Sequence, residues 1–418
     1  MNFRPATSIH RPRLLAIGLL LLLAATATSC RQKAGNKLFD PKQVAFTAEY
    51  NPLFDGQIYP SMLLATNQNN RDLQLATFNL SVTSPADNAV LRVVIDSSSL
   101  NYVTIFQEIL SHRGEQYTFQ PSVKWKYDVL RRLRQPGAVD LTFTCYINDE
   151  EVDIKNLHLA YRSVNECPLS LMYKNTTNDF RWLFAAYVNE DHPQIEQILT
   201  DIIDQGNVGR LNGYQSGDRA VRDQVFAVWY YALDRGIAYS SISCTSNPSP
   251  RANVQHIRFF DEVYSSRQAN CIDACVFFAS ILRKIGLKPV IFVEPCHAYL
   301  GYYTDKNRRN IALLETTITA WVNFPELDRS RDADGRLPDE SIEKIRKYLS
   351  AGDLARYQSG TLSYDQLKRT VARSLFDKAS EYDRETYTAN RDHFADSAFI
   401  TYQQLDIEQL RKLVQPIN

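Results

Sequence analysis

Residues 271–303 decide the expected fold, and they read CIDACVFFASILRKIGLKPVIFVEPCHAYLGYY. The first part predicts a helix from Cys271 to about Ile285, because the Gly-Leu-Lys-Pro that follows does not continue a helix easily. Three strands are predicted after it, at Val290–Val293, His297–Tyr303 and Asn310–Leu314. The expected order is therefore helix, strand, strand, strand.

Two residues of this segment, together with Glu315 after the last predicted strand, form a possible nucleophilic site. Cys271 begins the predicted helix, where the helix dipole and free backbone N–H groups favour a thiolate and can stabilise an oxyanion. His297 begins one predicted strand and Glu315 follows another. A thiol nucleophile needs an imidazole as base and a third group to orient that imidazole. In a helix packed on an antiparallel sheet, these strand ends can meet the start of the helix.

The same residues carry a family resemblance. Asn270-Cys271-Ile272-Asp273, Arg283-Lys284-Ile285-Gly286-Leu287, His297-Ala298-Tyr299 and Glu315-Thr316 resemble the motifs of the bacterial transglutaminase-like superfamily, whose core is papain-like. The resemblance covers about residues 175–325. It implies that Cys271 is the nucleophile, His297 the base and Glu315 the orienting acid, and that no cofactor or metal is used. Gln255 matches a glutamine often found upstream in such proteins, which implies a side-chain oxyanion donor.

The segment also departs from the family pattern. The acidic residue is Glu followed by Thr, where Asp followed by Pro is usual, and a Cys stands beside the histidine. If Cys296 lies on the strand, its side chain points away from that of His297. Cys271, Cys275, Cys296 and His297 could instead bind a metal, but the paired Cys-x-x-Cys spacing of zinc sites is missing. We therefore expect no metal site.

The regions before residue 255 favour first strands and then helices. Residues 139–148 alternate apolar and polar side chains, and similar runs occur at 43–50, 73–83, 89–96 and 152–161, which favours an antiparallel β-sandwich. A helical stripe follows from Ile195 to Ile203, with Asp191 as candidate cap and Gly206 near the end. A second helix is predicted over about 219–233.

The first thirty residues read as a targeting segment. Arginines precede an apolar run of about a dozen residues at 14–25, which is too short to span a bilayer and typical of a signal peptide. Ala27-Thr28-Ser29-Cys30 resembles a bacterial lipobox, which implies lipidation at Cys30. We therefore expect a membrane-anchored lipoprotein of the bacterial cell envelope, on the periplasmic face or the cell surface.

The charge balance and the cysteine spacing limit the classes of protein to which this sequence can belong. The chain has 47 basic and 47 acidic residues, so its charge gives no general argument for nucleic-acid binding. The cysteines other than Cys30 lack the regular spacing of a disulfide scaffold, although a bridge such as Cys145–Cys167 stays possible.

The expected fold class is α+β: an Ig-like antiparallel β-sandwich, a transglutaminase-like domain and a helical C-terminal extension. The expected divisions are a signal peptide at 1–29, a linker at 30–42, the β-sandwich at 43–168, the transglutaminase-like domain at 175–325 and the charged helical extension at 326–418.

Two functions fit this sequence. The first is a lipid-anchored cysteine peptidase, amidase or acyltransferase that acts on a protein or peptide, possibly a cell-wall peptide, through a thioester on Cys271. The second is a non-catalytic binding or scaffold lipoprotein that recognises a partner through its β-sandwich.

Overall fold

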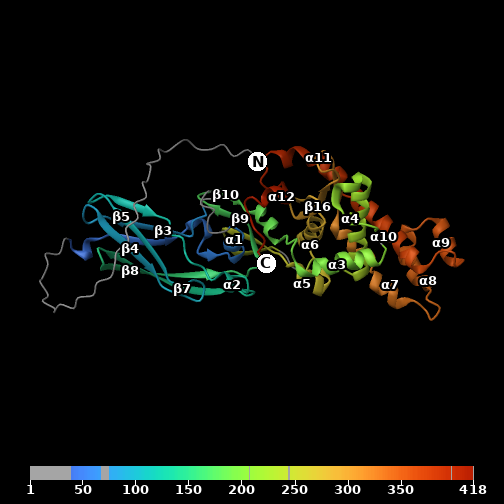
Figure 1. Cartoon of the computed structure of the whole chain (residues 1–418), viewed down its shortest axis with the longest axis horizontal. Coiled ribbons are helices and arrows are strands. Elements are labelled where there is room, and N and C mark those ends of the chain that lie inside the picture. The colour runs from blue at the N-terminus through green and yellow to red at the C-terminus, as the bar shows by residue number, and fades with distance from the viewer. Residues whose placement is uncertain (1–38, 67–74, 207, 243–244, 397, 418) are drawn as a thin grey trace.

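The computed structural model describes residues 39–66, 75–206, 208–242, 245–396 and 398–417. The predicted signal peptide and Cys30 lie outside these residues. Within them, every helix is too short or too polar to cross a membrane. The chain is an α+β protein, as expected. Figure 1 shows the N-terminal strands at one end of an elongated molecule and helices of the C-terminal third at the other.

The N-terminal region contains two sheets. One has the order β2-β8-β7-β4-β5 and the other the order β1-β3-β6, and all pairs are antiparallel except β2 with β8. The bounds are β1 Phe46–Tyr50, β2 Gln57–Ile58, β3 Phe78–Thr83, β4 Ala89–Ile95, β5 Thr104–Leu110, β6 Gln116–Phe119, β7 Gly137–Ile147 and β8 Glu150–Tyr161. Phe78 of the smaller sheet meets Phe143 of the larger one edge to face, with ring centroids 5.1 Å apart. The two sheets therefore share one core.

The alternating sequence pattern accounts for most of these strands. Strand β4 buries every second residue, which follows from the period of two along a strand. Strands β5 and β6 were not predicted. Strand β5 lies at the sheet edge and leaves Ile105 and Ile109 exposed, so its sequence does not alternate in the expected way. The short helices of this region are η1 Pro41–Gln43, η2 Pro52–Phe54, α1 Pro60–Ala65 and α2 Tyr127–Leu130.

A third sheet lies at the junction with the next region. Its order is β10-β9-β13-β12, with bounds β9 Glu166–Tyr173, β10 Thr176–Asp179, β12 Thr245–Ser249 and β13 Ala252–His256. Strand β9 follows the first two sheets directly and pairs with β13, some 80 residues later in the chain. This pairing joins the N-terminal sheets to the region that contains Cys271.

Most of the chain between β10 and Cys271 that does not belong to this sheet is helical. The helices are η4 Arg181–Tyr187, α3 Pro193–Asp204, η5 Gly213–Ser216, α4 Gly217–Arg235 and α5 Phe260–Ser266, with the short paired strands β11 Ala238–Tyr239 and β14 Gln268–Ala269. Asp191 was the predicted cap of α3, and this prediction is wrong. The ring of His192 accepts the hydrogen bond from the Gln194 N–H instead, because His192 directly precedes the first helical residue.

The segment 271–314 forms the predicted helix and three strands. Helix α6 spans Cys271–Lys284, and β15 Pro289–Glu294, β16 His297–Tyr303 and β17 Ile311–Leu314 follow it. The sheet order is β17-β16-β15-β18, and α6 packs against β15 and β16. Cys296 is not on a strand, as was assumed, but in the tight turn between β15 and β16. It is exposed and has a positive φ of 64°.

The C-terminal extension is mainly helical but also supplies a strand. Strand β18, Gln403–Asp406, pairs antiparallel with β15 and so completes the sheet of the preceding region. The helical elements are η6 Thr316–Ala320, α7 Phe324–Ser330, α8 Asp339–Ile345, η7 Arg346–Tyr348, α9 Ala351–Gln358, α10 Tyr364–Glu381, α11 Arg384–Ala395 and α12 Ile407–Leu410. The predicted helical extension therefore also contributes one strand to the sheet of the preceding region.

The described cysteines Cys145, Cys167, Cys271, Cys275 and Cys296 are all free thiols, so the possible Cys145–Cys167 bridge is not formed. Burial raises the pKa of the Cys145 thiol to about 12. A thiol in that state is a poor nucleophile, which agrees with a packing role for this residue.

Candidate functional site

His297 and Glu315 form the centre of the candidate site. His297 Nε2 lies 2.6 Å from Glu315 Oε2, which is the distance of a strong charge-assisted hydrogen bond. His297 is the first residue of β16, and Glu315 directly follows β17, the neighbouring strand in the sheet. Antiparallel pairing therefore brings the start of one strand beside the end of the other.

Cys271 approaches the same imidazole from helix α6. The Cys271 side chain lies close enough to that of His297 for a hydrogen bond between them to raise the pKa of the imidazole. Since Nε2 of the ring faces Glu315, Nδ1 is the nitrogen left for the thiol. The structure thus brings together all three residues that were predicted as a catalytic set.

The electrostatics of the pair favour a charged imidazole. Burial alone would lower the pKa of His297, but hydrogen bonds to Cys271 and Glu315 outweigh it and raise this pKa to about 11. Burial would raise the pKa of Glu315, and hydrogen bonds from His297, Asp383 and Thr317 lower it instead. An imidazolium between a carboxylate and Cys271 can stabilise the thiolate form of Cys271, which is the nucleophilic form of a cysteine.

Access to the three residues differs. The His297 side chain is 28% exposed, Cys271 is half-buried and the Glu315 side chain is fully buried. A substrate from solvent can therefore reach the thiol and the imidazole, whereas the carboxylate stays behind them.

A capping box holds the start of helix α6. The Asn270 side chain accepts from the Asp273 N–H at 2.8 Å, and the Asp273 side chain accepts from the Asn270 N–H at 3.0 Å. Asp273 also binds the backbone N–H and the guanidinium of Arg258, each at 2.8 Å. Burial raises the pKa of Asp273 against the lowering effect of these hydrogen bonds. The first helical turn and Cys271 are thereby fixed to the chain after β13.

Gln255 lies on β13, close to this helix start. Its side-chain amide donates to the carbonyl of His256 at 3.0 Å, and the Asn270 side-chain amide donates to the same carbonyl at 3.5 Å. The neighbourhood agrees with the residue's predicted place near the nucleophile. Its amide hydrogen is used within β13 in this structure, and its role as an oxyanion donor stays a prediction.

Sequence reasoning missed one residue of the site. Asp383, between α10 and α11, is buried, and its carboxyl is hydrogen-bonded to Glu315. Burial and the nearby Glu315 raise the pKa of Asp383 to about 8. It lies 68 positions after Glu315 in a hydrophilic stretch, and no motif in that stretch marks it.

His297, Glu315 and Asp383 are also the residues most suited to a metal ion. One potential ligand atom from each lies within 4.8 Å of the others. Protons can hold the same three side chains together without a metal: His297 and Glu315 share a short hydrogen bond, and the raised pKa of Asp383 favours its protonated form. No step of the chemistry considered below requires a metal.

Neither a scan against protein-family models nor a search of curated proteins finds a match. The geometry of the site therefore carries the functional interpretation.

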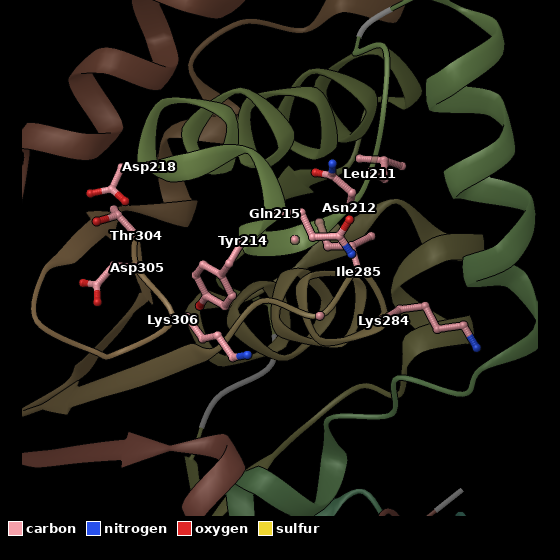
Figure 2. A pocket seen from close by; sticks show the side chains of 12 residues that line it. Leu211, Asn212, Tyr214, Gln215, Asp218, Lys284, Ile285, Thr304, Asp305 and Lys306 are labelled. Carbon is pink, nitrogen blue, oxygen red and sulfur yellow. The ribbon is translucent and has the colours of Figure 1, made fainter.

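A separate hollow of about 600 Å³ lies at the other end of α6. Its lining includes the loop at 211–215, the end of α6 at Lys284–Gly286, and the turn after β16 at Thr304–Lys306. Figure 2 shows the charged groups of Asp218, Lys284 and Lys306 around it. A 14-residue helix is about 21 Å long, so this hollow is remote from Cys271.

Proposed function

We propose that this protein is an exported, lipid-anchored cysteine hydrolase or acyltransferase that acts on amide bonds of a protein or peptide. The observation that carries this proposal is the double engagement of His297. One ring nitrogen is 2.6 Å from the buried carboxylate of Glu315, and the side chain of Cys271 at the tip of α6 interacts with the same ring and raises its pKa.

The reaction proceeds in two balanced halves. In the charged pair the proton of the Cys271 thiol is already on His297, and the thiolate Sγ attacks the amide carbonyl carbon. The C–N bond then breaks, the leaving amine takes the proton from His297, and a thioester remains on Cys271. Water or an amine, deprotonated by His297, attacks the thioester, the C–S bond breaks and the thiol is restored. Glu315 orients the imidazole and stabilises its charged form throughout.

The helix tip supplies the other element that the chemistry needs. The N–H groups of the first helical turn have no acceptor within the helix. The Asp273 N–H is used by the Asn270 cap, so the N–H groups of Cys271 and Ile272, at the start of α6, are the candidates to hold the negative oxygen of the tetrahedral intermediate. Gln255 is a second candidate donor after a change of its side-chain rotamer.

The proposal includes the fold and the location of the protein. The helix followed by an antiparallel sheet supports a transglutaminase-like core, and the two facing N-terminal sheets support an Ig-like β-sandwich. The apolar run and Ala27-Thr28-Ser29-Cys30 support export and lipidation at Cys30, and so a membrane-anchored place in a bacterial cell envelope. The site gives no reason to expect a cofactor, and a cell-wall peptide is one suitable substrate.

Alkylation of individual cysteines tests the proposal. The protein without residues 1–30 is treated with iodoacetamide from pH 5 to 9, and mass spectrometry follows each thiol. An ordinary thiol, with a pKa of about 8.5, is almost wholly protonated at pH 6. We expect Cys271 to react faster at pH 6 than the exposed Cys296, and His297→Ala to slow Cys271 at least tenfold, on the order expected for loss of a thiolate partner.

Two internal references control this experiment. Cys296 is exposed and serves as the accessible reference thiol in every variant. Cys275 is buried, and burial raises its pKa well above the usual range, so it should stay unlabelled while the protein is folded. If Cys271 reacts no faster than Cys296 at pH 6 and is indifferent to His297→Ala, the non-catalytic envelope lipoprotein is the better account.

A further inference from the structure

Asp383 occupies a position that its own helix does not explain. It is the N-cap residue of α11, where an aspartate side chain usually accepts a backbone N–H of the first turn. In this protein the side chain makes no such bond. Its carboxyl is directed instead to Glu315: one ligand atom each of His297, Glu315 and Asp383 lies within 4.8 Å of the others, and a side-chain hydrogen bond between the two carboxyls contributes to both of their pKa shifts. The contact with Glu315 therefore takes the place of the stabilising cap that an aspartate usually supplies at this position.

Two carboxyl groups in a hydrogen bond must share a proton, because a carboxylate only accepts. The proton lies on Asp383. The pKa of Asp383 is raised by burial and by Glu315, whereas hydrogen bonds from His297, Asp383 and Thr317 lower that of Glu315. Within the described residues no donor reaches the buried Asp383 Oδ2, which makes a charged carboxylate costly at this position and favours the neutral form.

Glu315 is thus held from several sides. Its Oε2 binds His297 at 2.6 Å, and its Oε1 accepts from the Thr317 N–H at 2.7 Å. We propose that Asp383 is a positioning residue of the site: its protonated carboxyl donates to Glu315 and thereby holds Glu315 against His297. This inference rests on the proposed function and extends the Cys271–His297–Glu315 set by one member from the C-terminal extension.

The surrounding helix is anchored in a way that keeps Asp383 in place. Tyr387, one turn later in α11, packs edge to face on Phe292 of β15, with centroids 5.2 Å apart. Phe394, further along α11, packs on the same ring at 5.3 Å. The Tyr387 contact holds the first turn of α11, and the Phe394 contact its last turn, against β15 of the sheet that carries His297.

Other titratable groups face Asp383 from the elements around it. They are Glu315 before η6, Glu294 on β15, His297 and Tyr299 on β16, and Cys275 on α6. Of these, Glu294 and Glu315 oppose ionisation of Asp383 and His297 favours it. Ionisation of Asp383 removes the donor to Glu315 and places a second negative charge beside it.

Two substitutions separate hydrogen-bond donation from ionisation. Asp383→Asn keeps a donor that never ionises, and Asp383→Ala removes the donor. Asp392→Asn, on the exposed face of the same helix, is the matched control. The readout is the rate of Cys271 alkylation between pH 6 and 9.5, divided by the rate for wild type at each pH.

The proposal predicts three results. The ratio for Asp383→Asn is close to one at pH 6 and rises several-fold above pH 8, because only the wild type loses its donor there. Asp383→Ala is several-fold slower already at pH 6, and Asp392→Asn follows wild type throughout. Thermal unfolding gives a readout that is independent of Cys271. The melting temperature of Asp383→Asn relative to wild type should increase from pH 5 to 8. The reason is that folding of the wild type requires Asp383 to bind a proton, which becomes less favourable as the pH rises, whereas the asparagine binds none.

The experiment distinguishes a failure of the Asp383 role from a failure of the proposed function. If His297→Ala slows labelling but the Asp383→Asn ratio does not change with pH, the positioning role of Asp383 is wrong and the proposed function stands. If His297→Ala has no effect, the proposed function itself is wrong. If the wild type retains one equivalent of a transition metal that Asp383→Asn lacks, the cluster is a metal site and the proton-sharing account is overturned.

Discussion

The backbone N–H of Glu315 donates to the carbonyl oxygen of Ala379 at 2.8 Å. Ala379 lies in the last turn of α10, so a residue of the C-terminal extension holds the backbone of the proposed orienting acid. Asp383 follows four residues later and holds its side chain. The extension is therefore part of the structural frame of the site.

His297→Gln should lower the free energy of unfolding in a manner that depends on pH. The pKa of His297 is raised from 6.5 to about 11, so its contribution is full below pH 6.5 and is lost as the pH rises through 11. The pKa of Glu315 is lowered from 4.5, so its contribution is lost as the pH falls below that value. We expect the largest effect between these limits, near pH 5.5. Urea denaturation at pH 3.5, 5.5 and 10 measures it.

His158→Gln is the control for this prediction, because its pair with Asp140 is exposed on both sides. Its effect on unfolding should be small at all three pH values. A loss for His297→Gln that is equal at pH 5.5 and pH 10 would contradict a charged His297 in the folded protein.

Arg258→Ala should destabilise the protein strongly. It removes the guanidinium partner of Asp273, whose side chain has no exposed surface. Breaking a buried pair in this way typically costs about 3–5 kcal/mol. Arg92→Ala, which breaks a pair with the exposed Asp149, should cost less than about 1 kcal/mol. Chemical denaturation of the two variants provides the comparison, and similar losses for both would argue against Asp273 as the anchor of α6.

Arg411→Ala should loosen the attachment of the chain end. Arg411 donates to the carbonyl of Ala185 at 2.6 Å and to Glu190 at 2.7 Å, and it also contacts the Val188 carbonyl. We expect a loss of roughly 2–4 kcal/mol at pH 7, since these are hydrogen bonds with charged partners. The exposed Lys412→Ala should have little effect.

The cost of Arg411→Ala should also depend on pH. Burial would raise the pKa of Glu190, but hydrogen bonds from Arg411 and Arg283 lower it to about 2. A lowered carboxylate pKa stabilises the fold above its ordinary value of 4.5 and ceases to do so as the pH falls toward 2. The difference from wild type should therefore shrink below pH 4.5. A difference that grows in acid would mean that Glu190 is not the relevant partner.

Cys30→Ser should release the full-length protein from membranes into the soluble fraction on expression in a bacterium. Two acyl chains on one protein bind a bilayer stably, and the substitution removes the thiol that would carry them. Fractionation and immunoblotting measure the distribution, with Cys296→Ser as the control substitution. Membrane association that is unchanged by Cys30→Ser would exclude the lipobox interpretation.

Local patterns account for much of the fold. The helix predicted from Cys271 to Ile285 spans Cys271–Lys284, and the one predicted over 219–233 spans Gly217–Arg235. Both helices have a clear apolar pattern and are followed closely by a glycine. These signals lie within the segment itself, so the helices can be predicted without information from distant residues. Strand β5 was missed because an edge strand with exposed isoleucines lacks the alternation that marks a strand with one buried face.

The sequence alone determined which residues of the helix and strand segment could cooperate, because Cys271, His297 and Glu315 each stand at the end of a locally encoded element. The tertiary structure decided that β18 completes the sheet and that Asp383 reaches Glu315. Neither follows from local pattern, since the contacts span 68 positions in one case and more than 100 in the other. Burial against distant partners also decides protonation: the same carboxyl is charged on a solvated helix and neutral beside a buried carboxylate.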